Sequence, residues 1–169
     1  MARNVEVKAR IDSVEAMLPQ ARALADGPPT PITQDDTFFV CAQGRLKLRD
    51  FGDGSGELIH YHRPDAEGPK LSDYVRVPTS EPAALRSALT RALGVLGRVR
   101  KTRLLLMVGA TRVHLDRVDG LGDFIELEVV LHDGQDAAEG EAIAVGLLER
   151  LGVAPSRCVP GAYLELLAR

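Results

Sequence analysis

The sequence predicts an α+β fold: a closed antiparallel β-barrel of about eight strands with helices packed outside it. Three observations predict this fold class. Polar and apolar residues alternate along segment after segment, most of these segments are joined by short turns, and helical spacing appears only between groups of strands. Closure at about eight strands leaves an interior wide enough for one small ligand.

The first expected strand covers residues 4–11, where every second residue is apolar. Its polar face carries Asn4, Glu6, Lys8 and Arg10. A helix should follow, since Ser13 can cap it and apolar residues then recur at helical spacing until Gly27. The chain therefore begins as a strand followed by a helix.

The next part of the chain has the pattern of consecutive strands. The expected strands here are residues 33–40, 44–51, 57–64 and 72–77. The segment GDGSG is rich in glycine and aspartate and predicts a hairpin turn between the second and third of them. Hairpin-length joins favour antiparallel neighbours.

The C-terminal half adds helices and further strands. Pro82 opens a helix in which Leu85, Leu89 and Leu93 recur at every fourth position. Three more strands are expected at residues 99–108, 111–118 and 124–131. A last helix should span residues 135–151, and Tyr163 in the tail is expected to pack in the core.

Composition limits the class of protein. The chain has 169 residues, of which 45% are hydrophobic and 27% charged, so we expect one globular domain over residues 1–169. A net charge of −3 argues against a general nucleic-acid surface. No apolar run approaches the roughly 20 residues of a membrane helix. The first residues lack a secretory signal, so we expect a cytoplasmic location with Cys41 and Cys158 reduced.

The polar faces of several strands are almost purely charged, and the charges are grouped by sign. The segment RLKLR groups cations, which suit a polyphosphate because Arg forms bidentate bonds to phosphate oxygens and Lys offers a point charge. The segment IELEV groups carboxylates, which suit Mg²⁺ or Mn²⁺. Such faces point either to bulk solvent or into a shared lumen. The scarcity of Ser and Thr on them favours the lumen.

At these residues the chain resembles the CYTH, or triphosphate tunnel metalloenzyme, superfamily, which includes class IV adenylyl cyclases, thiamine triphosphatase and inorganic triphosphatases. The family's ExExK signature corresponds to NVEVK here. The resemblance continues through RLKLR, SDYV, VRKTR, VHLD and DGLGDFIELEV, so it covers nearly the whole chain. The last segment looks most like the class IV cyclase branch.

The resemblance implies roles for individual residues. Lys8 and Arg49 are implied to be catalytic, as groups that organise the substrate. The expected substrate-binding residues are Arg45, Lys47, Arg49, Arg63, Lys101, Arg103 and Arg112, the last placed by alternation alone. The expected metal ligands, for Mg²⁺ or Mn²⁺, are Glu6, Asp116, Glu126 and Glu128. Because like charges repel, Arg49 and Arg103 are expected to serve ligand binding more than folding.

Four positions are left open. Asn4 replaces the first Glu of the signature with a neutral amide, so the tunnel has either one or two metal sites. His62 lies near the place where many family members have a Lys, and the register there is not fixed by the sequence. Asp73 stands where the family usually has an acidic residue, and His114 shares the charged face by alternation alone.

The same tunnel can support several functions. With water as the attacking group the outcome is hydrolysis of a terminal phosphate, and with the ribose 3′-hydroxyl of ATP it is cyclic AMP and pyrophosphate. We expect a metal-dependent triphosphatase, with a class IV adenylyl cyclase as the alternative and a non-catalytic polyphosphate or nucleotide binding protein as the second alternative. The expected partner is ATP, tripolyphosphate or thiamine triphosphate, with no nucleic acid and no membrane, and a homodimer is left open.

Overall fold

A computed structural model describes residues 2–64, 66 and 68–169. The described residues form strands and helices in an order close to the expected one. These elements are β1 (Ala2–Arg10), α1 (Val14–Leu24), β2 (Thr30–Phe39), β3 (Arg45–Asp50), β4 (Gly56–His62), β5 (Lys70–Thr79), α2 (Pro82–Leu93), β6 (Val95–Val108), β7 (Thr111–Val118), β8 (Gly122–Val130), α3 (Ala137–Arg150), a short 3₁₀ turn (Pro155–Arg157) and α4 (Tyr163–Leu167).

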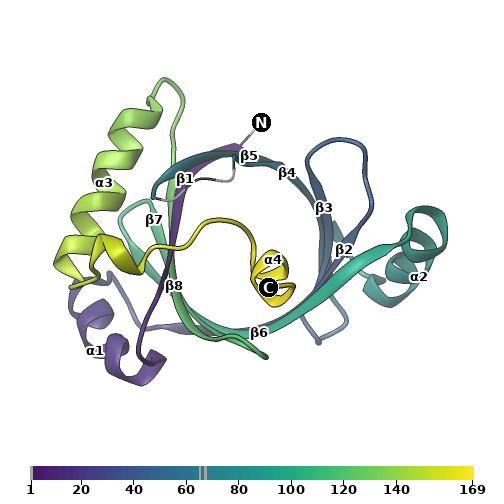
Figure 1. Cartoon of the computed structure of the whole chain (residues 1–169), viewed down its shortest axis with the longest axis horizontal. Coiled ribbons are helices and arrows are strands. Elements are labelled where there is room, and N and C mark those ends of the chain that lie inside the picture. Colours follow the sequence, from purple (N-terminus) through teal and green to yellow (C-terminus); the bar gives the residue numbers. More distant parts are fainter. Residues whose placement is uncertain (1, 65, 67) are drawn as a thin grey trace.

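The strands form a closed barrel, which confirms the predicted fold class. Its order is β1-β5-β4-β3-β2-β6-β7-β8, and every neighbouring pair is antiparallel, including β8 with β1. Figure 1 shows the ring formed by these strands. Strands β2 and β6 begin three and four residues earlier than expected, because they pair with each other from Thr30↔Leu105 to Phe39↔Val95.

Three helices lie outside the ring. Helices α1 and α3 lie beside β1, β7 and β8, whereas α2 lies on the opposite side beside β2 and β3 (Figure 1). The outward apolar residues of β1, among them Val5 and Val7, belong to the core beneath α1 and α3. Gly140 permits the close approach of α3, because a Cβ there would lie 2.7 Å from a Val5 methyl group. The opposite, inward face of β1 therefore lines the lumen.

The C-terminal helix α4 differs from the other helices, since it lies within the outline of the ring (Figure 1). The sequence analysis expected only a tail here, so α4 is a helix additional to those predicted outside the barrel. Its first residue, Tyr163, packs edge to face on Phe124 with ring centroids 5.0 Å apart, inside a buried apolar cluster. This cluster and α4 occupy part of the barrel interior. No helix in the described part of the chain is long and apolar enough to cross a membrane.

Candidate active site

The barrel encloses a cavity of about 220 Å³ that is lined by side chains from every strand. Alternation along each strand sends one set of side chains inward, so the charged faces meet in the lumen rather than in bulk solvent. Of the residues predicted from the sequence, the structure brings the following together around the cavity: Asn4, Glu6, Lys8, Lys47, Arg49, Arg63, Lys101, Arg103, Arg112, His114, Glu126 and Glu128.

One side of the lumen is cationic. We call Lys47, Arg49 and Lys101, which surround the carboxylate of Asp36, the cationic wall. Arg49 donates two hydrogen bonds of 2.8 Å to Asp36, and the ammonium groups of Lys101 and Lys47 lie 3.1 and 3.4 Å from the same carboxylate. Burial would raise the pKa of Asp36, but these three cations hold that pKa well below its ordinary value. Asp36 is therefore an ionised counterion with its oxygens fully engaged.

The cations of this wall repel one another and are attracted to Asp36. Burial, together with the charge of Arg49, lowers the pKa of Lys47 to about 7, against the opposing effect of Asp36. Burial also lowers the pKa of Lys101. Three cations around a single carboxylate leave excess positive charge facing the lumen, which favours a polyanionic ligand.

A second carboxylate, Asp116, is also fully engaged. Arg103 donates two hydrogen bonds to it, at 2.6 and 2.7 Å, and the Tyr163 hydroxyl donates a third at 2.8 Å. Asp116 is fully buried and does not line the cavity. Arg49 and Arg103 thus line the cavity and also pair with buried carboxylates that folding must keep satisfied.

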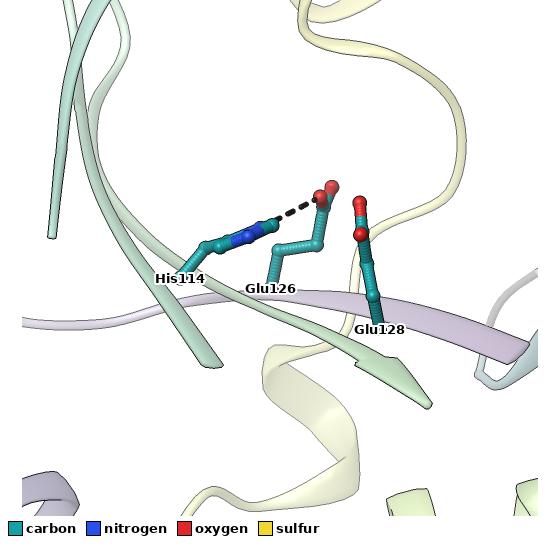
Figure 2. A group of neighbouring side chains, drawn as sticks. All are labelled: His114, Glu126 and Glu128. Carbon is teal, nitrogen blue, oxygen red and sulfur yellow. Dashed lines mark hydrogen bonds and ion pairs between the residues drawn. The ribbon is translucent and has the colours of Figure 1, made fainter. Parts of the chain in front are cut away.

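The opposite side of the lumen carries His114, Glu126 and Glu128, which we call the acidic wall. Strands β3 and β8 lie four positions apart in the ring of eight, so Lys47 and Arg49 stand across the lumen from Glu126 and Glu128. Figure 2 shows the three side chains projecting together from neighbouring strands. One ligand atom from each lies within 4.8 Å of the other two. Imidazole nitrogen and carboxylate oxygen are ordinary metal ligands, so these residues fit a divalent cation.

Among residues 2–64, 66 and 68–169, the ion-pair contacts of the acidic-wall carboxylates are all 3.4 Å or longer. Glu126 lies 3.4 Å from His114 Nδ1, 3.7 Å from Arg103 and 3.8 Å from Lys8, and Glu128 lies 3.4 Å from Arg112. Burial would raise the pKa of Glu126, but the His114 hydrogen bond and the charges of Lys8 and Arg103 hold that pKa well below its ordinary value. Glu126 is therefore ionised and keeps lone pairs available.

Strand β1 contributes mixed groups. Glu6 forms an ion pair with Arg63, yet burial raises the pKa of Glu6 despite that partner. Asn4 is only 3% exposed, and its Oδ1 has no hydrogen-bond partner among the described residues. Lys8 donates a 3.1 Å hydrogen bond to the carbonyl of Gly161, and its ammonium lies 3.9 Å from the Tyr163 ring centroid. Burial lowers the pKa of Lys8 to about 8.

Four predicted residues do not line the cavity. Besides Asp116, these are Arg45, His62 and Asp73. Arg45 shares the inward face of β3 but pairs with Glu165 of α4. His62 and Asp73 stand opposite each other on β4 and β5 and point away from the lumen, because their neighbours Tyr61 and Tyr74 point into it.

The sequence analysis missed two important lumen residues. Asp36 shares a strand face with Gln34 and Phe38, so the alternation used for the other strands would have found it. Tyr163 was expected in the core, and it both packs there and lines the cavity. Its second role arises from α4 entering the barrel, for which the sequence carries no periodic signal.

The walls together allow a specific kind of chemistry. Cations on one side can bind phosphate oxygens, and the acidic wall would hold a divalent ion that supplies further charge neutralisation for a polyanion. Phosphoryl chemistry needs such positioning and charge neutralisation more than covalent participation by the protein.

Comparisons with known proteins agree with this geometry. The PH1012 protein of Pyrococcus horikoshii OT3 superposes with a TM-score of 0.85 at 24% identity, covering 97% of this chain and 99% of that one. A candidate adenylate cyclase from Vibrio parahaemolyticus gives 0.77 at 19% identity, covering 98% of both chains. An adenylyl cyclase-like protein from Hippeastrum, described as having a dominant triphosphatase activity, gives 0.69 at 16% identity over 98% and 95% of the two chains. These likenesses show a shared fold.

The sequence itself identifies the family. A search among curated proteins gave no match. The family model of the CYTH domain matches residues 2–163, which is nearly the whole chain and includes both walls of the lumen. The chain therefore belongs to the CYTH family of enzymes, as its motifs predicted.

Proposed function

We propose that this protein is a metal-dependent triphosphatase that binds a triphosphate chain in the barrel and hydrolyses its terminal phosphate. The observation that carries the proposal is the pairing of two opposite walls in one cavity, one with excess cations and the other with unsaturated carboxylates. The relative from Hippeastrum with a dominant triphosphatase activity supports it.

Different residues would bind the phosphates and the metal ion. Lys47, Arg49 and Lys101 would bind phosphate oxygens by charge-assisted hydrogen bonds. Lys8 lies between the acidic wall and Tyr163 and would orient the phosphate nearest the metal. The expected ligands Glu126 and Glu128, together with His114, would hold the divalent ion, which neutralises charge on the phosphates.

The size of the cavity favours hydrolysis over cyclisation. At about 220 Å³ it is smaller than the roughly 300–1,000 Å³ of most small-molecule pockets, so it suits a triphosphate chain better than a whole nucleotide. Cyclisation requires the ribose 3′-hydroxyl to reach the α-phosphate inside the tunnel, whereas hydrolysis requires only water. The triphosphate chain is therefore the part of the substrate that the cavity would enclose.

One observation supports a second candidate function. The segment DGLGDFIELEV resembles the class IV adenylyl cyclases, and a candidate adenylate cyclase shares the fold. Conversion of ATP to cyclic AMP and pyrophosphate is therefore the alternative reaction for the same site.

The test is incubation with tripolyphosphate, ATP and thiamine triphosphate in Mg²⁺ or Mn²⁺, with every product separated. We expect release of orthophosphate from at least one of these compounds, dependent on the metal. Cyclic AMP with pyrophosphate would favour the cyclase. If well-folded protein binds a triphosphate but consumes none, the protein is a binding protein and the proposed activity is wrong.

A further inference from the structure

We propose that His114 is a metal ligand, and that His114, Glu126 and Glu128 form a mixed nitrogen and oxygen site that prefers Mn²⁺ to Mg²⁺. The role of the ion in turnover rests on the proposed function, but the binding itself does not. The proposal follows from geometry, from unfilled bonding capacity and from the types of ligand atom.

The geometry places the three side chains on adjacent strands. His114 of β7 stands directly opposite Glu126 of β8, and Glu128 follows two residues later on the same face. Their ligand atoms lie within 4.8 Å of one another, and all three side chains project the same way (Figure 2). Metal bonds of about 2.1 Å bring ligand atoms within roughly 4.2 Å of each other, so only small side-chain rotations are needed.

Unfilled bonding capacity separates these carboxylates from the other buried ones. Asp36 and Asp116 each accept two bonds of 2.8 Å or less from an arginine. By contrast, the ion-pair partners of Glu126 and Glu128 among the described residues approach no closer than 3.4 Å. A buried carboxylate without close donors is costly, and a bound cation would satisfy it.

An independent observation points to the same place. Asn4 Oδ1 lines the cavity, is buried, and lacks a hydrogen-bond partner among the described residues. Glu6, beside it on β1, pairs with Glu128 in register but is engaged by Arg63. Strand β1 thus offers one unsatisfied neutral oxygen, while the negative charge for a cation comes from β8.

The ligand types determine which metal is favoured. Mg²⁺ prefers oxygen ligands alone and gives up its water reluctantly, whereas imidazole suits first-row transition metals. Mn²⁺ suits carboxylate and water oxygens as Mg²⁺ does, and as a first-row transition-metal ion it also accepts imidazole nitrogen more readily than Mg²⁺ does. A histidine in the ligand set therefore shifts preference from Mg²⁺ towards Mn²⁺.

The experiment uses the full chain without substrate. Mn²⁺ is titrated into the protein and followed by electron paramagnetic resonance, and spin-echo modulation then reports whether a ¹⁴N nucleus coordinates the bound ion. We expect one strongly bound Mn²⁺ with an imidazole ¹⁴N signal, and Mg²⁺ competing more weakly than Mn²⁺. His114→Gln should remove the ¹⁴N signal and weaken Mn²⁺ binding by about tenfold or more.

His132→Gln is the matched control, since His132 is exposed and lies outside the cavity. It should leave both the affinity and the ¹⁴N signal unchanged. Bound Mn²⁺ without ¹⁴N modulation in the unmodified chain, no Mn²⁺ binding, or equal competition by Mg²⁺ would each overturn the proposal. A nitrogen-coordinated Mn²⁺ in a protein that consumes no triphosphate would uphold this inference while refuting the proposed function.

Discussion

Buried carboxylates lie close to their cationic neighbours on one wall of the lumen and farther from them on the other. On the cationic wall, Asp36 is surrounded at 2.8–3.4 Å by Arg49, Lys101 and Lys47. On the acidic wall, Glu126 and Glu128 have no ion-pair contact shorter than 3.4 Å among the described residues. The first arrangement saturates the carboxylate and fixes its cations, whereas the second leaves bonding capacity for a ligand. The spacing of partners, rather than the presence of a carboxylate, distinguishes a structural acid from a candidate metal ligand.

The largest expected effect is on stability at the cationic wall. Asp36→Asn leaves Arg49, which cannot lose its proton, buried without its counterion, and should cost about 3–5 kcal/mol of unfolding free energy. Asp35→Asn is the matched control, because Asp35 is adjacent but partly exposed, and its loss should cost about 1 kcal/mol or less. Urea unfolding measures both. Similar small losses for the two variants would show that Asp36 is not a required counterion.

The Arg103–Asp116 ion pair beside Tyr163 should also be required for stability. Arg103→Met leaves Asp116 buried with only the Tyr163 hydroxyl, and should cost about 3 kcal/mol of unfolding free energy. The double variant Arg103→Met with Asp116→Leu should recover most of that loss, because no buried charge is left unpaired. If the double variant is as unstable as the single one, packing rather than charge explains the effect.

Ligand binding should depend on pH through the cationic wall. The pKa of Lys47 is about 7, so its charge is present below that pH and is lost above it. Tripolyphosphate binds the charged form, so its metal-free Kd should rise by up to about tenfold per pH unit above 7.

Isothermal titration between pH 7.5 and 9 measures this slope, and proton uptake on binding should accompany it. Lys47→Arg keeps its charge throughout and should give a flatter profile. Identical slopes for both proteins would assign the titration to another group.

The smallest expected effect concerns Asn4. Asn4→Glu adds a carboxylate beside Glu6, and should lower the metal concentration for half-maximal activity by less than about tenfold, because β8 supplies most of the negative charge. Asn4→Gln introduces a side chain as long as Glu but without its charge, and should not lower the metal concentration for half-maximal activity. A metal titration at saturating triphosphate compares them, and equal curves would exclude β1 from metal binding.

Much of the fold followed from the sequence because alternation is a local property. A closed barrel turns one face of every strand inward, so the charged faces at Lys47, Arg103 and Glu126 could be assigned to one lumen without coordinates. The entry of α4 into the barrel could not, because it depends on long-range contacts such as Lys8 with Gly161.

The site was predicted less completely, for a physical reason. The sequence shows the type of each residue and the strand face on which it lies. It does not show the distance from each carboxylate to its ion-pair partners. Asp116 and Glu126 look alike in the sequence, yet Arg103 saturates the first with bonds of 2.6 and 2.7 Å and approaches the second only to 3.7 Å. Asp73 and His62 were left open by the sequence, and strand register turns both away from the lumen.

The most direct test of the account asks whether the two walls bind different ligands. The Kd of tripolyphosphate without metal and the Kd of Mn²⁺ without triphosphate are measured for Lys47→Met and Glu128→Gln, which change charge with little change in shape. We expect Lys47→Met to weaken tripolyphosphate binding by about tenfold or more, since a charged hydrogen bond contributes about 1.5–3 kcal/mol, and to leave Mn²⁺ binding unchanged. Glu128→Gln should weaken Mn²⁺ binding and leave tripolyphosphate binding equal or tighter. If each variant weakens both ligands alike, the division of the lumen into a phosphate-binding wall and a metal-binding wall is wrong.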